Sequence, residues 1–366
     1  MRRKLILLIP LLSLAALNLH AATTANLQPD LAIPDSTPLN HIQVIGSHNS
    51  YKLLPAPEVE QMIAAVAPAA AKELHYEHEP LPDQLNRGLR NLEIDVLHDP
   101  EGGRYANPLA LKLLGDKHPP FDRTPLLAPG YKILHAPDID FRSHHATLAD
   151  CLQTLKTWSE LNPQHAPVFI TMNIKEDKAY VPGGVNALPF TETAARDLNQ
   201  EILTHLGPEH LLTPTTTQGA ATSLNQAITQ NGWPNIGQTR GKFVFILDAG
   251  TTTLNTYNQA CTPSTRTLFS SYPPGHPDSA FLILNNPITS SNEINRLSAQ
   301  GYIVRTRADS GTLEARDNNT TRRDTALQSG AQIITTDYYP GRNLFTNSYS
   351  VVFPDQTFIR LHPTTR

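Results

Sequence analysis

The sequence has little cysteine, little charge and no basic excess. Its 366 residues include two cysteines, too few for a disulfide-stapled scaffold or a cysteine-rich zinc module. Charged residues make up 17%, below the ~25% of an average globular chain, and the 39% of hydrophobic residues is too high for a disordered protein. The formal net charge of −4 offers no electrostatic basis for binding nucleic acid. Composition therefore predicts a folded protein whose partners are not nucleic acids.

Long hydrophobic runs are also missing, apart from one near the start. Residues 5–19 are almost wholly apolar, follow the basic residues 2–4 and precede small residues at positions 21, 22 and 25. This order is typical of a signal peptide, so we predict that residues 1–22 are removed, with cleavage between positions 21 and 25. The protein would then be secreted or periplasmic. The alternative is an uncleaved N-terminal anchor, although the run is short of the ~20 residues that a membrane span needs.

Eight short apolar runs lie in the remaining chain, residues 23–366, and no repeat of fixed period is present. Most of these runs lack polar alternation, which is typical of parallel strands buried on both faces. Several of these runs are separated by segments whose apolar residues have helical spacing, at residues 148–161, 191–206 and 292–299. This alternation predicts an α/β fold, a single-domain (β/α)8 TIM barrel. The expected strands are residues 41–46, 91–96, 131–135, 168–174, 242–248, 280–285, 301–305 and 331–336.

Long stretches with proline and glycine interrupt this pattern. The chain has 31 prolines, more than the ~5% of an average protein. Residues 100–129, 181–189 and 250–279 are predicted to be loops at one end of the barrel. Residues 348–362, after the last expected strand, are predicted to form a short strand pair or a tail. The two cysteines, Cys151 and Cys261, are compatible with a disulfide or with two separate buried thiols.

Two carboxylates on the second expected strand suggest a metal site. Glu93 and Asp95 are two positions apart, so both side chains point to one face of the strand. Inside a barrel they would need a compensating cation. A hard divalent ion suits them, Ca2+ more than Mg2+, with amide oxygens from Asn49 and Asn173. The alternative is that both acids form ion pairs with Arg or Lys inside the barrel.

Two histidines end expected strands and are candidates for acid–base catalysis. His48 follows the first strand and His135 ends the third, so they could face each other across the barrel mouth. The alternative is that both are structural. The other histidines considered are expected on the surface: His75, His78, His118, His144 and His145.

Basic residues at the same rim would suit an anionic substrate. Lys175, Arg305 and Arg307 lie at or just beyond the ends of expected strands. Together with a metal ion, they would stabilise the charge that develops on a phosphodiester during cleavage. Structural salt bridges are the alternative for each of them.

The segments that hold these residues resemble one enzyme family. Residues 45–51 (IGSHNSY) and 89–96 (LRNLEIDV) resemble the first two strand motifs of phosphoinositide-specific phospholipase C catalytic domains. Further segments are similar to the third and fourth strands of that family and to its secreted, single-domain, calcium-dependent subfamily. These segments are residues 133–135, 148–152, 167–173, 305–309 and 331–338.

The resemblance implies a role for each candidate residue. Asn49, Glu93 and Asp95 match calcium ligands, and Asn173 stands where the family often has a glutamate, which removes one negative charge. His135 matches the general acid and His48 the histidine that contacts the phosphate and assists attack. Lys175 and Arg307 are weaker matches for phosphate or inositol contacts. The implied reaction converts phosphatidylinositol to diacylglycerol and inositol 1,2-cyclic phosphate.

Two other functions fit parts of the pattern. A glycerophosphodiester phosphodiesterase uses the same barrel, but its first strand typically ends in His-Arg-Gly rather than His48-Asn49-Ser50. A non-catalytic barrel that binds a lipid or sugar is the other alternative. Peripheral membrane contact through Leu109, Leu113, Phe121 or Leu126 is a further expectation, with a buried loop core as its alternative. No basic cluster lies on an expected loop, which favours unphosphorylated phosphatidylinositol or a soluble phosphodiester as substrate.

Overall fold

The computed structural model describes residues 26–363. The predicted signal peptide, residues 1–22, lies outside the described residues. Within the described range, no helix combines the length and the apolar character that crossing a membrane requires.

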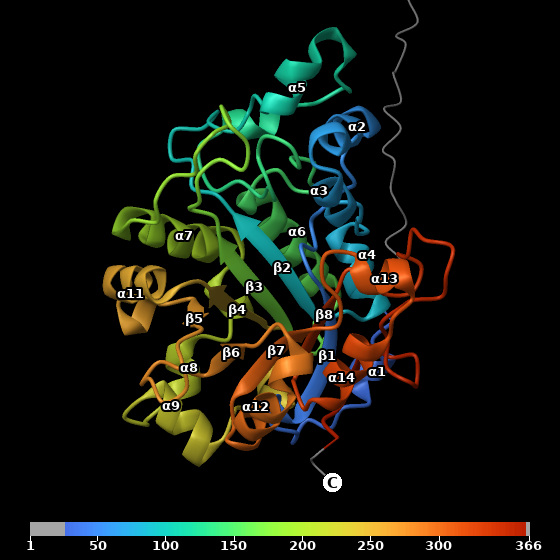
Figure 1. Cartoon of the computed structure of the whole chain (residues 1–366). Helices are drawn as coiled ribbons and strands as arrows, with labels where there is room; N and C mark the ends of the chain where they lie inside the picture. Colours follow the sequence, from blue (N-terminus) through green and yellow to red (C-terminus); the bar gives the residue numbers. More distant parts are fainter. Residues whose placement is uncertain (1–25, 364–366) are drawn as a thin grey trace, which may run out of the picture.

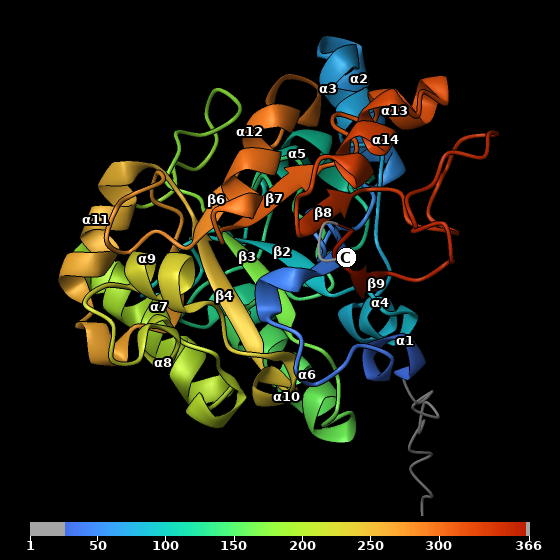
Figure 2. The same ribbon diagram turned by 90° about the horizontal axis from the view of Figure 1, so that it is seen from below.

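Eight parallel strands form a nearly closed barrel with helices around it, which confirms the predicted TIM-barrel fold (Figures 1 and 2). The strands follow the order β5-β4-β3-β2-β1-β8-β7-β6, and a short ninth strand pairs antiparallel with β1. The described residues show no pairing between β5 and β6, so the barrel has a seam there. The strands are β1 (Ile42–Ser47), β2 (Asn91–Val96), β3 (Val168–Ile174), β4 (Phe243–Asp248), β5 (Leu268–Ser270), β6 (Phe281–Ile283), β7 (Ile303–Arg307), β8 (Ile333–Thr336) and β9 (Ile359–Leu361).

One expected strand is absent from the barrel, and one strand of the barrel is not among those expected. Residues 131–135 do not join the barrel, because Lys132 forms only isolated antiparallel bridges, with Leu97 and Thr147. The apolar side chains of residues 131–135 are buried under neighbouring segments, so their apolar character reflects burial and not pairing in the sheet. The fifth strand is β5, inside the segment 250–279 that was expected to be a loop and that also contains a helix. β5 contains only two adjacent apolar residues, Leu268 and Phe269, so no apolar run marks it in the sequence.

The helices agree with the predictions where the amphipathic pattern is long. The expected helix at residues 148–161 has the same bounds in the structure, and Thr147 caps it by accepting a hydrogen bond from the Asp150 backbone N–H. The helices are α1 (Gln28–Leu31), α2 (Pro57–Val66), α3 (Pro68–Glu73), α4 (Leu81–Arg87), α5 (Leu109–Leu114), α6 (Leu148–Leu161), α7 (Glu192–His205), α8 (Pro214–Gln218), α9 (Leu224–Gln226), α10 (Ile236–Thr239), α11 (Thr251–Ala260), α12 (Pro287–Ala299), α13 (Leu313–Asp317) and α14 (Thr321–Gln328).

Alternate residues of β2 serve two different environments. Leu92 and Ile94 are fully buried in a hydrophobic cluster that also holds residues of α6 and α7. Because side chains alternate along a strand, Glu93 and Asp95 point to the opposite side, into the barrel interior. At the start of β2, Gly46 of β1 faces Asn91, and a Cβ on this glycine would lie 2.2 Å from the Asn91 carbonyl oxygen. Glycine therefore permits the close approach of β1 and β2.

Both cysteines are buried free thiols, Cys151 in α6 and Cys261 directly after α11. Burial raises the pKa of Cys151, which disfavours its reactive thiolate. The structure thus agrees with two separate thiols rather than a disulfide.

Candidate active site

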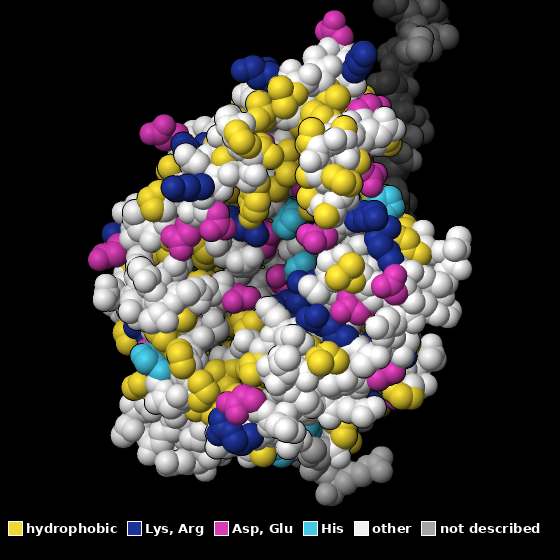
Figure 3. Space-filling model, viewed as in Figure 1, with side chains coloured by type: hydrophobic (Ala, Val, Ile, Leu, Met, Phe, Trp, Pro, Cys, Tyr) yellow, Lys and Arg dark blue, Asp and Glu magenta, His cyan; other side chains and the backbone are white. Residues whose placement is uncertain are grey.

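A cavity of about 450 Å3 opens at the carboxyl ends of the strands. Charged and histidine side chains gather around a hollow at this end of the molecule (Figure 3). Chain segments far apart in the sequence contribute to the wall, from the end of β1 to the residue after β8. The cavity is lined by His48, Glu73, Leu74, Tyr76, His135, Arg307, Ser310, Gly311, Leu313, Glu314, Arg322 and Asp337. The structure therefore brings the two predicted catalytic histidines and Arg307 to one cavity.

His48 is held by a carboxylate at the end of β8. Its Nδ1 lies 2.9 Å from Asp337 Oδ1, and the Asp337 side chain is almost completely buried. The next residue, Asn49, has a φ of 48°, a left-handed conformation that asparagine tolerates better than most residues. The ring of His48 also stacks on Tyr76, with 6.1 Å between the ring centroids. These contacts fix the orientation of the imidazole.

Arg307 reaches the same histidine and sets its proton state. Arg307 Nη2 lies 3.2 Å from His48 Nδ1 and 3.5 Å from Asp337 Oδ2. Since Nδ1 cannot donate to Asp337 and accept from Arg307 together, we assign its proton to the shorter contact with the carboxylate. Nε2 is then an unprotonated acceptor. Burial, and next the positive charge of Arg307, hold the pKa of His48 well below its usual value, so the ring is neutral near pH 7.

His135 forms a second histidine–aspartate pair. Its Nδ1 lies 2.8 Å from Oδ2 of the fully buried Asp140, which leaves Nε2 as the other proton-carrying position of the ring. The buried Lys52 lies 3.3 Å from Asp140 Oδ1 and donates to the backbone carbonyls of Leu74 and Tyr76. Burial raises the pKa of Asp140, but the charges of Lys52 and His135 lower it by more, so the pKa lies below its usual value. Asp140 is therefore an anionic support for His135.

The predicted metal ligands Glu93 and Asp95 are each paired with a basic side chain. Arg305 Nη2 contacts Glu93 Oε2 inside the barrel. Lys175 Nζ lies 3.0 Å from Asp95 Oδ2, and Asn173 Nδ2 donates to Asp95 Oδ1 at 2.9 Å. The ion-pair alternative of the sequence analysis is thus what the structure contains.

These residues do not fit a calcium ion as they are arranged. An amide that faces a carboxylate must present its N–H, so the Asn173 oxygen is turned away from Asp95. Asn49 likewise uses Nδ2 to donate to the Tyr76 hydroxyl, at 2.7 Å. Among residues 26–363, no three His, Cys, Asp or Glu side chains are grouped so that they could hold a metal ion. We therefore derive no catalytic step through calcium.

Several supporting residues were missed or misplaced by sequence reasoning. Asp337 directly follows the expected strand 331–336, and no motif marks Lys52 or Asp140, although Asp140 follows His135 by five residues. His78 and His145 were expected on the surface but are buried. The reason is that His78 Nε2 bonds the His48 backbone carbonyl at 2.7 Å, and His145 Nδ1 pairs with Asp150 at 2.5 Å.

Lys175 and Arg307, the two predicted substrate contacts, take different positions. Arg307 lines the cavity, whereas Lys175 is not among the residues that line it. Burial lowers the pKa of Lys175, but the charge of Asp95, together with Tyr180, raises it overall above the usual value. Lys175 is therefore a fixed cation paired with Asp95.

A family model described as phosphoinositide phospholipase C, Ca2+-dependent, matches residues 37–363. A comparison with curated proteins found no match.

Among solved structures, the apo form of a calcium-dependent phosphoinositol-specific phospholipase C from Pseudomonas sp. is similar. It has 16% identity and a TM-score of 0.54, over 91% of this chain and 99% of that one. A structure described as its myoinositol complex has 15% identity and a TM-score of 0.54, with the same coverage. A Ca2+-dependent phosphatidylinositol-specific phospholipase C from Streptomyces antibioticus has 16% identity and a TM-score of 0.51, over 83% and 96% of the two chains. At these identities the likeness concerns the fold.

Proposed function

The chain belongs to the Ca2+-dependent phosphoinositide phospholipase C family, whose members are phosphodiesterases, and on this premise we propose that it cleaves phosphatidylinositol to diacylglycerol and inositol 1,2-cyclic phosphate. The observation that carries the proposal is the pair of histidine–aspartate contacts in one cavity, His48 with Asp337 and His135 with Asp140. One histidine can then accept a proton while the other donates one.

In the proposed reaction His48 acts as the general base. Its neutral Nε2 takes the proton of the inositol 2-hydroxyl, and the 2-oxygen forms a bond to the adjacent phosphorus. Asp337 keeps the proton on Nδ1 and so keeps the accepting tautomer in place. Because nucleophile and phosphorus belong to one molecule, orientation supplies much of the rate advantage.

His135 acts as the general acid on the opposite side of the phosphorus. As the bond from phosphorus to the glycerol oxygen breaks, the proton on His135 Nε2 passes to that oxygen and diacylglycerol leaves. Asp140 holds Nδ1 and orients the ring for this transfer. Arg307 lines the cavity and offers its guanidinium to the negative charge that builds on the phosphate oxygens. Calcium would supply further charge stabilisation in family members that bind it.

A substrate panel tests this proposal. Phosphatidylinositol, glycerophosphoinositol and glycerophosphocholine are incubated with the enzyme, and the products are identified by phosphorus NMR. We expect cyclic inositol phosphate from the first substrate. Release of glycerol 3-phosphate from the soluble diesters, without cyclic product from the lipid, would instead support a glycerophosphodiester phosphodiesterase. Binding of the lipid without turnover would support a non-catalytic barrel.

Contact with a lipid surface is part of the proposed function. Leu113 in α5 and Leu127 are 67% and 52% exposed, and hydrophobic side chains gather over α2 and α5 in Figure 3. Leu126 is buried and Phe121 packs on Phe141, so these two serve the loop core instead. We expect Leu113→Ser to weaken binding to phosphatidylinositol vesicles while leaving turnover of a soluble substrate unchanged. Equal vesicle binding would exclude Leu113 from the contact.

Export remains a prediction from the first residues of the chain. We propose that residues 1–22 direct the protein out of the cytoplasm and are then removed. Mass spectrometry of the protein expressed with its own N-terminus tests this. A mature chain that starts between positions 22 and 26 is the expected result, and an intact Met1 in the membrane fraction would indicate an anchor.

A further inference from the structure

Two basic side chains occupy the electrostatic role that a divalent ion would have in this barrel. We propose that Arg305 and Lys175 take the place of calcium beside Glu93 and Asp95, so that this chain folds and cleaves its phosphodiester without the metal. The inference about turnover rests on the proposed function. The inference about metal binding does not, because it concerns the charge balance of the protein alone.

The first pair joins opposite parts of the barrel. Arg305 comes from β7 and contacts Glu93 on β2, and both side chains are about 5% exposed or less. Arg305 Nη1 also donates to Asn285 Oδ1 at 2.8 Å and lies 4.0 Å from Asp248 Oδ2. A guanidinium held by three partners in a buried site is a permanent positive charge. It lies against one of the two carboxylates that would have to bind calcium.

The second pair occupies the other carboxylate. Asp95 is fully buried, with Lys175 Nζ at 3.0 Å from one oxygen and the Asn173 amide donating to the other. The Lys175 side chain is 13% exposed, so water screens this pair weakly. A glutamate at position 173 would be repelled by Asp95 unless a cation separated them. Asparagine removes that need, because its N–H binds the carboxylate directly.

Each of the two carboxylates on β2 already has a cation beside it. Glu93 and Asp95 contribute two negative charges, and Arg305 and Lys175 contribute two positive charges. A calcium ion would have to displace both cations or lie beside them, and like charges at a few ångströms in a poorly solvated site repel strongly. Asp248 is the remaining carboxylate nearby, and its Oδ2 faces the Arg305 guanidinium at 4.0 Å.

A positive charge for the phosphate is still present. Arg307, two residues after Arg305 on β7, lines the cavity beside His48. Its planar guanidinium can bind two phosphate oxygens together, as a chelating cation would. The two buried cations thus neutralise the β2 carboxylates, and Arg307 faces the substrate.

The primary test is calorimetric titration of calcium into the wild-type chain without lipid. We expect no saturable binding in the low millimolar range. Binding that saturates and is abolished by Asp95→Asn would overturn the proposal. This measurement gives the same answer whether or not the protein turns over phosphatidylinositol, so it separates failure of this inference from failure of the proposed function.

The second test compares turnover in EDTA and in calcium. Phosphatidylinositol is presented in neutral detergent micelles, because calcium also binds anionic vesicles. We expect rates within about twofold of each other, since no reacting group depends on the ion. Loss of turnover in EDTA that calcium restores would contradict the proposal. If no phosphatidylinositol is cleaved in either condition, the proposed function fails and calorimetry still decides the metal question.

A gain-of-binding variant tests the cause. Asn173→Glu combined with Lys175→Met and Arg305→Met returns a carboxylate and removes both cations. We expect it to bind calcium at least about tenfold more tightly than the wild type. The matched control is Lys132→Met, which removes a buried cation 3.5 Å from Asp99, outside the site, and should bind no more calcium than the wild type. A folded triple variant without calcium binding would show that these cations are not what excludes the ion.

Discussion

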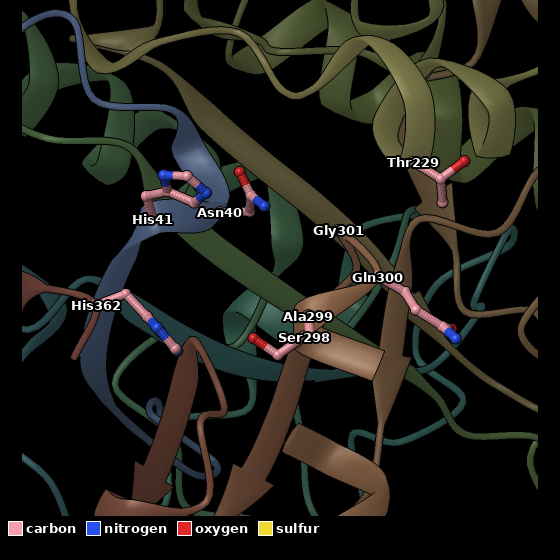
Figure 4. A pocket seen from close by; sticks show the side chains of 8 residues that line it. All are labelled: Asn40, His41, Thr229, Ser298, Ala299, Gln300, Gly301 and His362. Atoms are coloured by element: carbon pink, nitrogen blue, oxygen red, sulfur yellow. The ribbon is translucent and has the colours of Figure 1, made fainter. Parts of the chain in front are cut away.

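The two ends of the barrel carry cavities of similar size and different chemistry. The mouth cavity has a volume of about 450 Å3, and a pocket of about 470 Å3 lies at the amino ends of the strands. Both contain two histidines. Figure 4 shows His41 and His362 on one side of the second pocket, which we call the base pocket, with Thr229 and Gln300 on the other.

The partners of the histidines distinguish the two ends. At the mouth, His48 and His135 each contact a buried aspartate, and Arg307 lies beside them. At the base, His362 Nε2 contacts the Gly330 backbone carbonyl at 2.8 Å, and the residues that line the pocket include no acid, lysine or arginine. A histidine thus becomes an acid–base candidate through a fixed carboxylate and a nearby cation, not through its place in a cavity.

The largest effect is expected from removing a histidine at the mouth. His135→Ala should lower kcat by about 10²–10⁴-fold, because the leaving oxygen loses its proton donor. His41→Ala at the base pocket is the control and should leave kcat unchanged. Steady-state rates with circular dichroism of both variants check this. Comparable losses in the two variants would break the distinction between the two ends.

Removing the cation at the mouth should have the next largest effect. Arg307→Met should lower kcat by about 10²–10³-fold, because the charge on the phosphate oxygens then lacks its partner. Arg307→Lys should recover part of the loss, since it restores the charge without the planar fork. A lysine variant no better than the methionine variant would mean that Arg307 only supports the fold.

The buried support of His135 should govern stability as well as rate. Asp140→Asn leaves Lys52, whose side chain is fully buried, without its carboxylate, so we expect a loss of roughly 3 kcal/mol in the free energy of unfolding. The matched variant Asp35→Asn removes the partner of Arg240, an aspartate that is 72% exposed, and should cost less than about 1 kcal/mol. Urea unfolding measures both. Equal costs would show that burial is not what makes the Asp140 contact important.

The pH dependence of stability should have opposite signs at the two ends. His165, just before β3, has its pKa lowered to about 4 by burial. As the pH falls, the unfolded chain therefore takes up a proton on His165 before the folded chain does. The contribution of His165 to the free energy of unfolding is complete above about pH 6.5 and is lost as the pH falls towards 4. This contribution amounts to up to about 3 kcal/mol. Burial, and then the charge of Asp337, raise the pKa of Asp309 to about 7 near the mouth. The contribution of Asp309 to the free energy of unfolding is complete below about pH 4 and is lost as the pH rises through 7.

The difference in unfolding free energy between wild type and variant isolates each group. The free energy of unfolding that wild type has over His165→Gln should shrink as the pH falls. The corresponding difference from Asp309→Asn should shrink as the pH rises. Urea midpoints measured across this range provide both curves. Slopes of the same sign would contradict the assignment of either group.

Local sequence patterns predicted the parts of the site that one strand or one motif supplies. The spacing of Glu93 and Asp95 places both on the interior face of β2, because the alternating Leu92 and Ile94 pack against the helices. The position of His48 follows from the first apolar run, because this residue comes directly after the buried strand β1. The run at residues 131–135 was assigned to the barrel wrongly, since burial alone does not separate a strand from an irregular segment under a loop.

The barrel, the family motifs and the placement of acids and histidines at strand ends can be predicted from the chain alone, because they follow from local periodicity and short-range order. Whether the two acids meet a metal or a basic side chain depends on the folded arrangement. The partner of Glu93 is Arg305, 212 residues away, and the partner of His48 is Asp337, 289 residues away. Such contacts depend on which strand ends converge at the mouth, and Coulomb interactions there act through space rather than along the chain.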